Sequence, residues 1–569
     1  MSPQKLFKAA GLIVLALMAQ ISFAQDRVIT GKVTDSKDGS PLQGATVAAK
    51  GSGSGAQTGS DGTFRISVPS TVNALIVSSV GFATKEVSIE GKNSIEVALV
   101  ITNTSMDEVV VVSYGTRRKS DLTGSVTSVS AKDFQKGNIN SPEQLLQGKV
   151  AGLQITTGGG SAGGGSRIRI RGGASLNASN DPLIVIDGVP VEGNGIAGSA
   201  NVLNSINPND IESISVLKDA SATALYGSRA SNGVLIVTTK KGVKGKLRFN
   251  YNNLFSVGTV GKTVEVLTAG QVTDIINSDA AETGNNTYKN LLGSSNTNWQ
   301  DEIYQSAFGI DNTISVSGGL GNVPFRASLG YLNQDGILKT NNFNRFSTAL
   351  NLSPKLFENH LAVNLSVKAS QTKNTFANEG AIGSSIAFDP TKPVLSGNKE
   401  WGGYYEWLQA NNLPIDLSTR NPLGLLNLRD NTSKVGRVIG NVDLDYKLHF
   451  FPDLHIKMNF GLDYLSGSGN DNIDSVSATN YKTGGRKTFY EQKKVNTLAD
   501  IFLFYEKNIK SIDSKIDVLV GHSYQDFLTK VYNYPSFSYR AIADPNNPAK
   551  KDTIQGSEPT FPDDNPRFR

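Results

Sequence analysis

The 569-residue chain contains no cysteine, and only 38% of its residues are hydrophobic. The lack of cysteine excludes a disulfide scaffold and metal sites built from thiolates. Beyond the N-terminal segment, the chain has no apolar run long enough for a membrane-spanning helix, which excludes a helical membrane bundle. The 58 glycines and the short strand-like segments instead predict a mainly β protein, and the length allows several domains.

The net charge of +5 comes from lysines and arginines that are scattered along the chain. No basic stripe interleaved with aromatic residues appears, so we expect a solvated surface and no nucleic-acid partner. At the N-terminus, Lys5 and Lys8 precede an apolar run over residues 9–19, and small residues follow at Ser22 and Ala24. This pattern predicts a cleaved secretory signal peptide over residues 1–24 and a mature protein outside the cytoplasm.

Residues 26–101 alternate short strand candidates with turn signals. The turns are marked by Asp38-Gly39 and Asp61-Gly62. The expected strands are Val28–Val33, Ala45–Ala49, Thr63–Val68, Ala74–Ser78 and Ile95–Leu99. Regular short strands of this kind predict a small β-sandwich. Asp35 and Asp38 lack the full spacing of a calcium loop, so we expect them to be turn residues.

Residues 121–240 interleave strands with short helices and predict a compact α/β domain. Helices are expected to start at Ser141-Pro142-Glu143, with the serine hydroxyl as cap, and to cover Ser221–Tyr226. The glycine run 158–165 is expected to be a loop rather than a phosphate site, because a strand follows it where a helix is needed. The expected strands are Val126–Val129, Leu153–Thr156, Arg167–Arg171, Leu183–Ile186, Ile211–Leu217 and Val234–Thr239.

From residue 245 to residue 569 apolar and polar residues alternate strictly. The clearest hairpin is expected to turn at Phe451-Pro452-Asp453. Alternation over about 10 residues is typical of a transmembrane β-barrel with apolar faces toward lipid and polar faces toward the lumen. A soluble sandwich would alternate as well. Nine strands are expected, near residues 246, 312, 324, 344, 360, 437, 454, 495 and 514.

The lengths of the connections favour the barrel. Long connections, such as 371–434 and 466–493, alternate with short ones, such as 320–323, 354–359 and 508–513, as in barrels with external loops and periplasmic turns. Nine strands are fewer than the roughly 22 of plugged transporter barrels, so we expect an incomplete antiparallel transmembrane β-barrel.

No catalytic or metal-binding group emerges from the spacing of the polar residues. His360 and His522 are isolated, and His449 and His455 are expected to share the lumenal face of adjacent strands without a third ligand. We therefore expect no catalytic residue, no metal and no cofactor, and predict that the protein is not an enzyme.

The linker 106–120 contains an uninterrupted strand former. Its residues are Asp107, Glu108, Val109, Val110, Val111 and Val112. Four consecutive valines favour a strand, and no neighbouring hairpin is expected to claim it. Such a segment can be the last strand of the upstream unit, or it can pair with the sheet edge of another protein.

Several motifs, in order, resemble one family. The motifs 146–153, 167–172, 182–190, 206–213 and 216–233 are similar to the plug domain of SusC/RagA-like TonB-dependent outer-membrane transporters. The motifs 31–35, 41–47 and 61–64 resemble the carboxypeptidase-regulatory-like domain of these proteins, and residues 107–116 resemble their TonB box.

This resemblance implies import of an oligomeric nutrient across the outer membrane. TonB, with its inner-membrane energising complex, would grip residues 107–112. A SusD-like surface lipoprotein would cover the barrel, whose outer face meets outer-membrane lipid, and the substrate would be a glycan or, alternatively, a peptide. The rival hypothesis is a secreted or surface β-rich binding protein that transports nothing.

An aromatic motif lies in the long connection 371–434. It contains Trp401, Tyr404, Tyr405 and Trp407. Loop parity places the motif outside the cell, where we expect exposed rings to bind substrate by stacking on sugars. The same rings can anchor the protein at the membrane interface or pack the loop.

Overall fold

The computed structural model describes residues 26–552 except for short gaps. The gaps are residues 80–81, 101–108, 113–114, 119–125, 174–175, 178, 194, 200, 220–223, 322, 510–513, 533, 535, 539–541 and 545–546. The predicted signal peptide therefore lies outside the described residues, as do Asp107 and Glu108 of the linker. The chain divides into two units, residues 1–109 and 110–569, which are described separately.

The first unit contains two packed sheets, as predicted. One sheet has the order β4-β1-β7 and the other β3-β2-β5-β6. Alternate residues of each strand point inward, so that Ile29, Val47 and Leu75 lie in a shared apolar core. The strands are β1 (Arg27–Asp35), β2 (Thr46–Ala49), β3 (Gly55–Gln57), β4 (Thr63–Val68), β5 (Ala74–Ser78), β6 (Lys85–Ser88) and β7 (Ser94–Leu99). The short strands β3 and β6 were not predicted.

Both aspartates predicted as turn residues have that role. Asp35 Oδ1 accepts a hydrogen bond from the Lys37 backbone N–H at 2.8 Å, and Asp38 Oδ1 accepts one from Ser40 at 2.9 Å. Such bonds from a side chain to the backbone two residues on stabilise tight turns.

The valine segment of the linker forms a hairpin of its own. β8 (Val109–Val112) pairs with β9 (Gly115–Arg118) in a two-stranded sheet. The segment is therefore neither the last strand of the upstream sandwich nor free of a neighbouring hairpin, and both of those expectations were wrong.

The second unit begins with an α/β domain, which we call the plug. Its main sheet has the order β10-β15-β16-β13-β14, and β11 pairs with β12 in a separate hairpin. The strands are β10 (Val126–Ser130), β11 (Leu153–Thr157), β12 (Ser166–Ile170), β13 (Leu183–Ile186), β14 (Val189–Val191), β15 (Ile211–Leu217) and β16 (Val234–Thr239). All six predicted strands are present, and only β14 was missed.

The predicted helices of the plug are short 3-10 turns. They are η2 (Pro142–Leu146) and η5 (Ala224–Ala230), and two further 3-10 turns, η3 (Val202–Ser205) and η4 (Pro208–Asp210), were not predicted. The Ser141 hydroxyl does not cap η2, because it bonds the Glu143 carboxylate instead. The capped helix expected there was wrong, and residues 221–223 of the second expected helix lie outside the described part.

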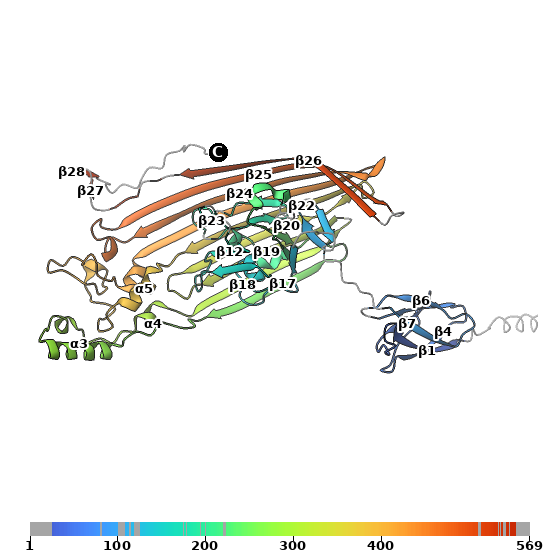
Figure 1. The fold of residues 1–569 in the computed structure, drawn as a ribbon, viewed down its shortest axis with the longest axis horizontal. Coiled ribbons are helices and arrows are strands. Elements are labelled where there is room, and N and C mark those ends of the chain that lie inside the picture. Colours follow the sequence, from blue (N-terminus) through green and yellow to red (C-terminus); the bar gives the residue numbers. More distant parts are fainter. Residues whose placement is uncertain are drawn as a thin grey trace, which may run out of the picture. The chain divides into compact units, whose positions relative to one another are not determined.

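A large antiparallel sheet follows the plug. Its strands are neighbours in chain order, and the plug elements lie against its middle (Figure 1). The strands are β17 (Arg248–Gly258), β18 (Ala307–Leu320), β19 (Val323–Asp335), β20 (Asn342–Leu352), β22 (Leu361–Thr375), β23 (Arg429–Leu448), β24 (Phe451–Ile473), β25 (Arg486–Ile509) and β26 (Ser514–Tyr532), with the two-residue β21 (Lys355–Leu356) beside β22. These are the nine predicted strands, but β23, β24 and β25 are far longer than expected.

The long connections contain most of the helical structure. α3 (Ala269–Thr283), η6 (Lys289–Leu291) and α4 (Trp299–Ile303) lie between β17 and β18, while α5 (Gly380–Ala387), η7 (Lys399–Trp401) and α6 (Pro422–Asn427) lie between β22 and β23. α3, α4 and α5 all lie at one end of the large sheet (Figure 1). No helix among the described residues has the length and apolar character needed to cross a membrane.

The tight hairpin between β23 and β24 turns at His449-Phe450, one step before the predicted position. A register irregularity follows Lys447, and Phe451-Pro452-Asp453 belongs to β24. The two predicted strands pair and keep the predicted faces, but the register differs by two residues from the one that the predicted turn implies, with Leu444 opposite Met458 and Tyr446 opposite Ile456.

Candidate functional site

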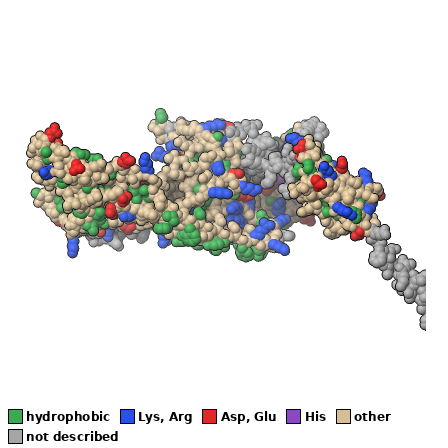
Figure 2. Space-filling view, turned by 90° about the horizontal axis from the view of Figure 1, so that it is seen from below, with side chains coloured by type: hydrophobic (Ala, Val, Ile, Leu, Met, Phe, Trp, Pro, Cys, Tyr) green, Lys and Arg blue, Asp and Glu red, His purple; other side chains and the backbone are tan. Residues whose placement is uncertain are grey.

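The large sheet has one apolar face and one polar face that meets the plug. Along β19 the side chain of Leu329 is 54% exposed, whereas its neighbour Arg326, three positions earlier on the other face, is 5% exposed. Because successive strand residues point to opposite sides, all strands divide their side chains in this way. Figure 2 shows hydrophobic side chains gathered along one margin of the larger unit.

Buried arginines of the polar face bind the plug. Arg345 of β20 is 1% exposed, and its Nη1 donates to the backbone carbonyls of Asn140 at 2.8 Å, Asn204 at 3.1 Å and Ile206 at 3.1 Å. Arg326 Nη2 pairs with Asp210 Oδ1 at 2.8 Å. The carbonyl groups near the end of the 3-10 turn η3 would otherwise have no donor, and Arg345 of the sheet supplies one.

Arg437 of β23 connects a carboxylate of the sheet with the plug. Its Nε and Nη2 donate to Asp463 Oδ1 at 2.8 Å and Oδ2 at 2.9 Å, a bidentate pair, and both side chains are almost fully buried. The remaining Nη1 donates to the carbonyl of Val202 at 2.9 Å. Since Asp463 holds the guanidinium in place, the bond to the plug carbonyl has a preformed donor.

A tight turn of the plug presents Asp187 to the sheet. Asp187 and Gly188 have φ of 45° and 88° and form the two-residue loop between β13 and β14, which is typical of an Asp-Gly hairpin. The Asp187 carboxylate accepts hydrogen bonds from the Thr239 hydroxyl at 2.6 Å and from the ammonium of Lys368 on β22. Lys494 of β25 pairs in the same manner with Glu192 of the plug at 2.8 Å.

A polar cavity of about 310 Å³ remains between plug and sheet. Asp187 and Lys241 line it from the plug, and Asn364, Asp443 and Lys457 line it from the sheet. Its lining of opposite charges is suited to water and polar solutes rather than to an apolar ligand.

The sequence analysis did not identify these plug-binding cations. Each stands at a polar position of the alternating pattern, where a charged residue is ordinary, so nothing in the local pattern distinguished them. Their shared signal is that arginine and lysine recur at inward positions over five strands, β19, β20, β22, β23 and β25.

The aromatic motif in the connection between β22 and β23 is only partly exposed. Trp401 is 1% exposed, packs against Tyr481 with ring centroids 6.1 Å apart, and donates from Nε1 to the Asn412 carbonyl at 3.0 Å. The expectation of an exposed ring was wrong for Trp401, because this ring packs the interior of the loop. Tyr404 is half-buried, and its hydroxyl accepts a hydrogen bond from Asn427 at 3.0 Å.

Tyr405 and Trp407 form a partly exposed aromatic pair. Their rings meet edge to face at 5.7 Å, and the Lys392 ammonium lies 5.4 Å and 5.0 Å from the two ring centres. Burial raises the pKa of Tyr405 above its ordinary value, and the nearby Asp389 adds to this effect. Lys392 itself is buried and donates to the Leu291 carbonyl, so the two rings are the part of the motif that a ligand can reach.

Glu406 points the other way, into the packed interior of the loop. Burial raises its pKa to about 7, and the Asn421 backbone N–H, 3.2 Å from Oε1, opposes that effect only in part. Its Oε2 is buried without a hydrogen-bond partner. A protonated carboxyl is the form that suits such an environment.

Asp416 joins two external connections. It accepts hydrogen bonds from the Tyr481 hydroxyl at 2.6 Å and from Lys482 Nζ at 2.7 Å. Both bonds lower the pKa of Asp416, the one from Lys482 more strongly. The connection between β22 and β23 is therefore fastened to that between β24 and β25.

The two histidines of the β23–β24 hairpin lie on opposite faces, so the expectation of a shared lumenal face was wrong. His455 Nδ1 lies 2.7 Å from Asp445 Oδ1. His449 bonds the Tyr446 hydroxyl at 2.9 Å and stacks on His360, because the irregular turn redirects it. Within the described ranges no group of three or more histidine or acidic side chains is arranged to hold a metal.

Comparisons with known families match both predicted domains. The family described as "TonB-dependent Receptor Plug Domain" matches residues 118–234. The family described as "CarboxypepD_reg-like domain" matches residues 29–111, which extends the predicted sandwich into the linker.

Curated relatives align over nearly the whole chain. "TonB-dependent receptor SusC" of Bacteroides thetaiotaomicron is 39% identical over 542 residues, covering 92% of this chain and 52% of that protein. "TonB-dependent receptor P3" of Formosa agariphila is 33% identical, covering 94% of this chain and 51% of that protein. The chain thus spans about half the length of the curated relatives it matches.

A solved structure shares the fold. "Structure of the RagAB peptide transporter" has a TM-score of 0.60 at 23% identity and covers 73% of this chain and 48% of that one. The combination of plug and surrounding antiparallel sheet is therefore found in an experimentally determined structure.

Proposed function

This chain belongs to the SusC-like TonB-dependent receptors, and we propose that the protein of which it is part imports an oligomeric nutrient across the outer membrane. The observation that carries the proposal is the plug held against the polar face of the sheet by buried arginines and lysines. Such a plug closes a barrel and has to shift before a solute can pass.

TonB, energised from the inner membrane, supplies the force in this proposal. Among the described residues β8 pairs only with β9, so in that part of the chain the other edge of each strand carries no partner strand. A TonB strand can add to such an edge through main-chain hydrogen bonds. Residues 107–112 are the proposed contact.

The substrate in this proposal is a glycan delivered beneath a SusD-like surface lipoprotein, with a peptide as the alternative. Tyr405 and Trp407 support a glycan, because aromatic faces stack on sugars and each contact contributes on the order of 1 kcal/mol.

Energy coupling is tested by replacing Val110 and Val111 with proline in the full-length protein. Proline removes the ladder donors of β8, so uptake of a labelled oligosaccharide mixture by whole cells should stop. The matched control replaces Val260 and Val266 with proline. These two valines lie in the irregular external connection after β17, so this variant should take up the oligosaccharides normally. Unchanged uptake by the β8 variant, at a normal level of heat-modifiable protein in the outer membrane, would refute the coupling role.

A further inference from the structure

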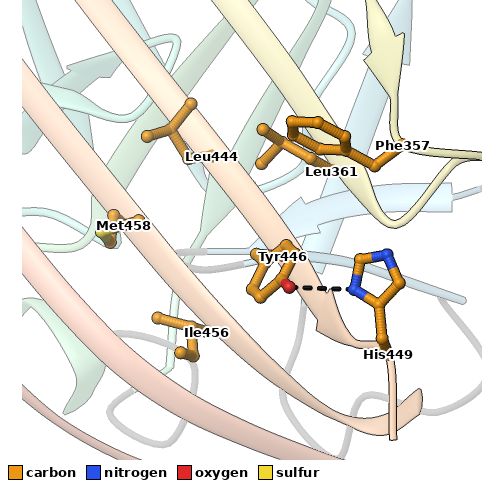
Figure 3. A pocket seen from close by; sticks show the side chains of 7 residues that line it. All are labelled: Phe357, Leu361, Leu444, Tyr446, His449, Ile456 and Met458. Carbon is orange, nitrogen blue, oxygen red and sulfur yellow. Dashed lines mark hydrogen bonds between the residues drawn. The ribbon is translucent and has the colours of Figure 1, made fainter.

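An apolar pocket of about 390 Å³ opens on the face of the large sheet that points away from the plug. Leu444 and Met458 face each other across β23 and β24, and Tyr446 lies between Ile456 and Leu361 in the pairing register. Figure 3 shows these side chains around one space, with His449 at its end near the turn. The volume is in the range of small-molecule sites.

Exposed aromatic residues surround this end of the sheet. Phe450 is 85% exposed in the tight turn, Phe357 is exposed in the neighbouring turn, and Phe451 stacks on Tyr505 with ring centroids 5.7 Å apart. Aromatic girdles mark the membrane interfaces of outer-membrane barrels, and short turns mark the periplasmic side. The pocket therefore lies where headgroups meet acyl chains.

His449 lines the polar end of the pocket, and His360 stacks on it. The rings of His360 and His449 are 4.0 Å apart and tilted by only 8°. His360 Nδ1 donates to the Lys447 carbonyl at 3.0 Å, and His449 Nδ1 bonds the Tyr446 hydroxyl at 2.9 Å. When His449 Nδ1 accepts from the Tyr446 hydroxyl, the ring proton lies on Nε2, which can donate to an anion, and the stacked His360 ring holds His449 in place.

The turn that holds Phe357 over the pocket is strained. Phe357, Glu358 and Asn359 have φ of 51°, 52° and 72°, a left-handed conformation that non-glycine residues rarely adopt in succession. The His360 N–H closes the turn by donating to the Phe357 carbonyl at 2.8 Å. Strain of this kind persists where the surroundings impose it and often accompanies a ligand site.

We propose that this pocket binds one glycerophospholipid, with an acyl chain along Leu444 and Met458 and the phosphate at His360 and His449. The inference rests on the proposed function only in placing this face in the membrane. A second copy of the chain fits less well, because apolar protein surface in lipid gains little by covering other protein. Glu358, exposed in the same turn, disfavours a free anion, whereas the acyl chain of a lipid adds apolar contact.

The test uses the purified full-length protein in detergent micelles with two probes of equal chains, dioleoylphosphatidylglycerol and dioleoylglycerol, which lacks the phosphate. Bound lipid is counted by native mass spectrometry during titration. The protein should bind the phospholipid about tenfold more tightly, as expected for a charge-assisted hydrogen bond. In the double variant His360→Ala and His449→Ala, this preference should disappear.

A second variant tests the acyl site separately. Leu444→Trp should weaken binding of both probes about tenfold or more, whereas Leu329→Trp, on the same face outside the pocket, should change neither. Equal binding of the two probes by the parent protein would overturn the phosphate site, and unchanged binding by Leu444→Trp would overturn the pocket. Nutrient uptake should stay normal in every variant, so these results are independent of the import hypothesis.

Discussion

Replacing Arg345 with methionine should release part of the plug without disturbing the sheet. The side chain is buried, and its three hydrogen bonds satisfy carbonyls of Asn140, Asn204 and Ile206. Methionine fills a similar volume but donates nothing. A buried carbonyl left without a donor costs ~1–3 kcal/mol, and since such losses add incompletely we expect about 3 kcal/mol for the three together.

Hydrogen exchange measures this loss directly. A local opening that is about 3 kcal/mol easier should speed the exchange of amides in residues 201–206 by about two orders of magnitude. Arg429→Met is the matched control, because Arg429 pairs with Asp471 on the sheet and not with the plug. Both proteins should keep heat-modifiable migration. If the amides of residues 201–206 then exchange as slowly in Arg345→Met as in the parent protein, the reasoning is refuted.

Three further predictions concern the external loops and the first unit. Burial raises the pKa of Glu406 from 4.5 to about 7, so the folded loop loses stability as pH rises between these two values, by about 3 kcal/mol at most above pH 7. The loop should therefore be cleaved by a protease faster at pH 8 than at pH 5. Glu406→Gln should abolish this difference. Trp401→Ala should destabilise the loop by ~3–5 kcal/mol, which faster proteolysis would show, whereas Trp407→Ala should weaken oligosaccharide binding and leave the loop folded. A folded loop in Trp401→Ala together with an unfolded loop in Trp407→Ala would disprove this division of roles. Gly31→Ala should lower the unfolding temperature of the sandwich measured by calorimetry, because a Cβ there would lie 2.2 Å from a backbone oxygen of the neighbouring strand. Gly53→Ala is the control and should leave that temperature unchanged, because open space surrounds Gly53.

Strand positions were predictable because each strand meets two different environments. Along β19 and β24, apolar and polar residues alternate with the pleat, and this pattern alone located the strands to within a few residues. Strand lengths were not predictable. Beyond the apolar band both faces of β23–β25 become polar, as in Ser466-Gly467-Ser468-Gly469, so the pattern fades although pairing continues.

The candidate site was less predictable than the fold. A hydrophobic pattern shows which face a tryptophan prefers, but whether Trp401 is covered depends on Tyr481, which lies 80 positions away and arrives through tertiary folding. The partners of Arg345 are backbone carbonyls, which every residue has, so no composition signal marks them. Asp187 lies in an Asp-Gly pair, but neither its turn between β13 and β14 nor its partner Lys368 was predicted.

If the protein imports a solute as proposed, the length of β25 would set the form of the route. Its 24 residues, at ~3.3 Å each, span roughly 80 Å, which at a tilt of ~40° is about 60 Å along the membrane normal. The apolar band of such barrels is only ~25 Å tall, so roughly half of the wall stands clear of the lipid. A solute would first meet this rigid, hydrogen-bonded part of the wall rather than mobile loops. The width of the wall there would limit the size of the solute before it reaches any side chain at the plug.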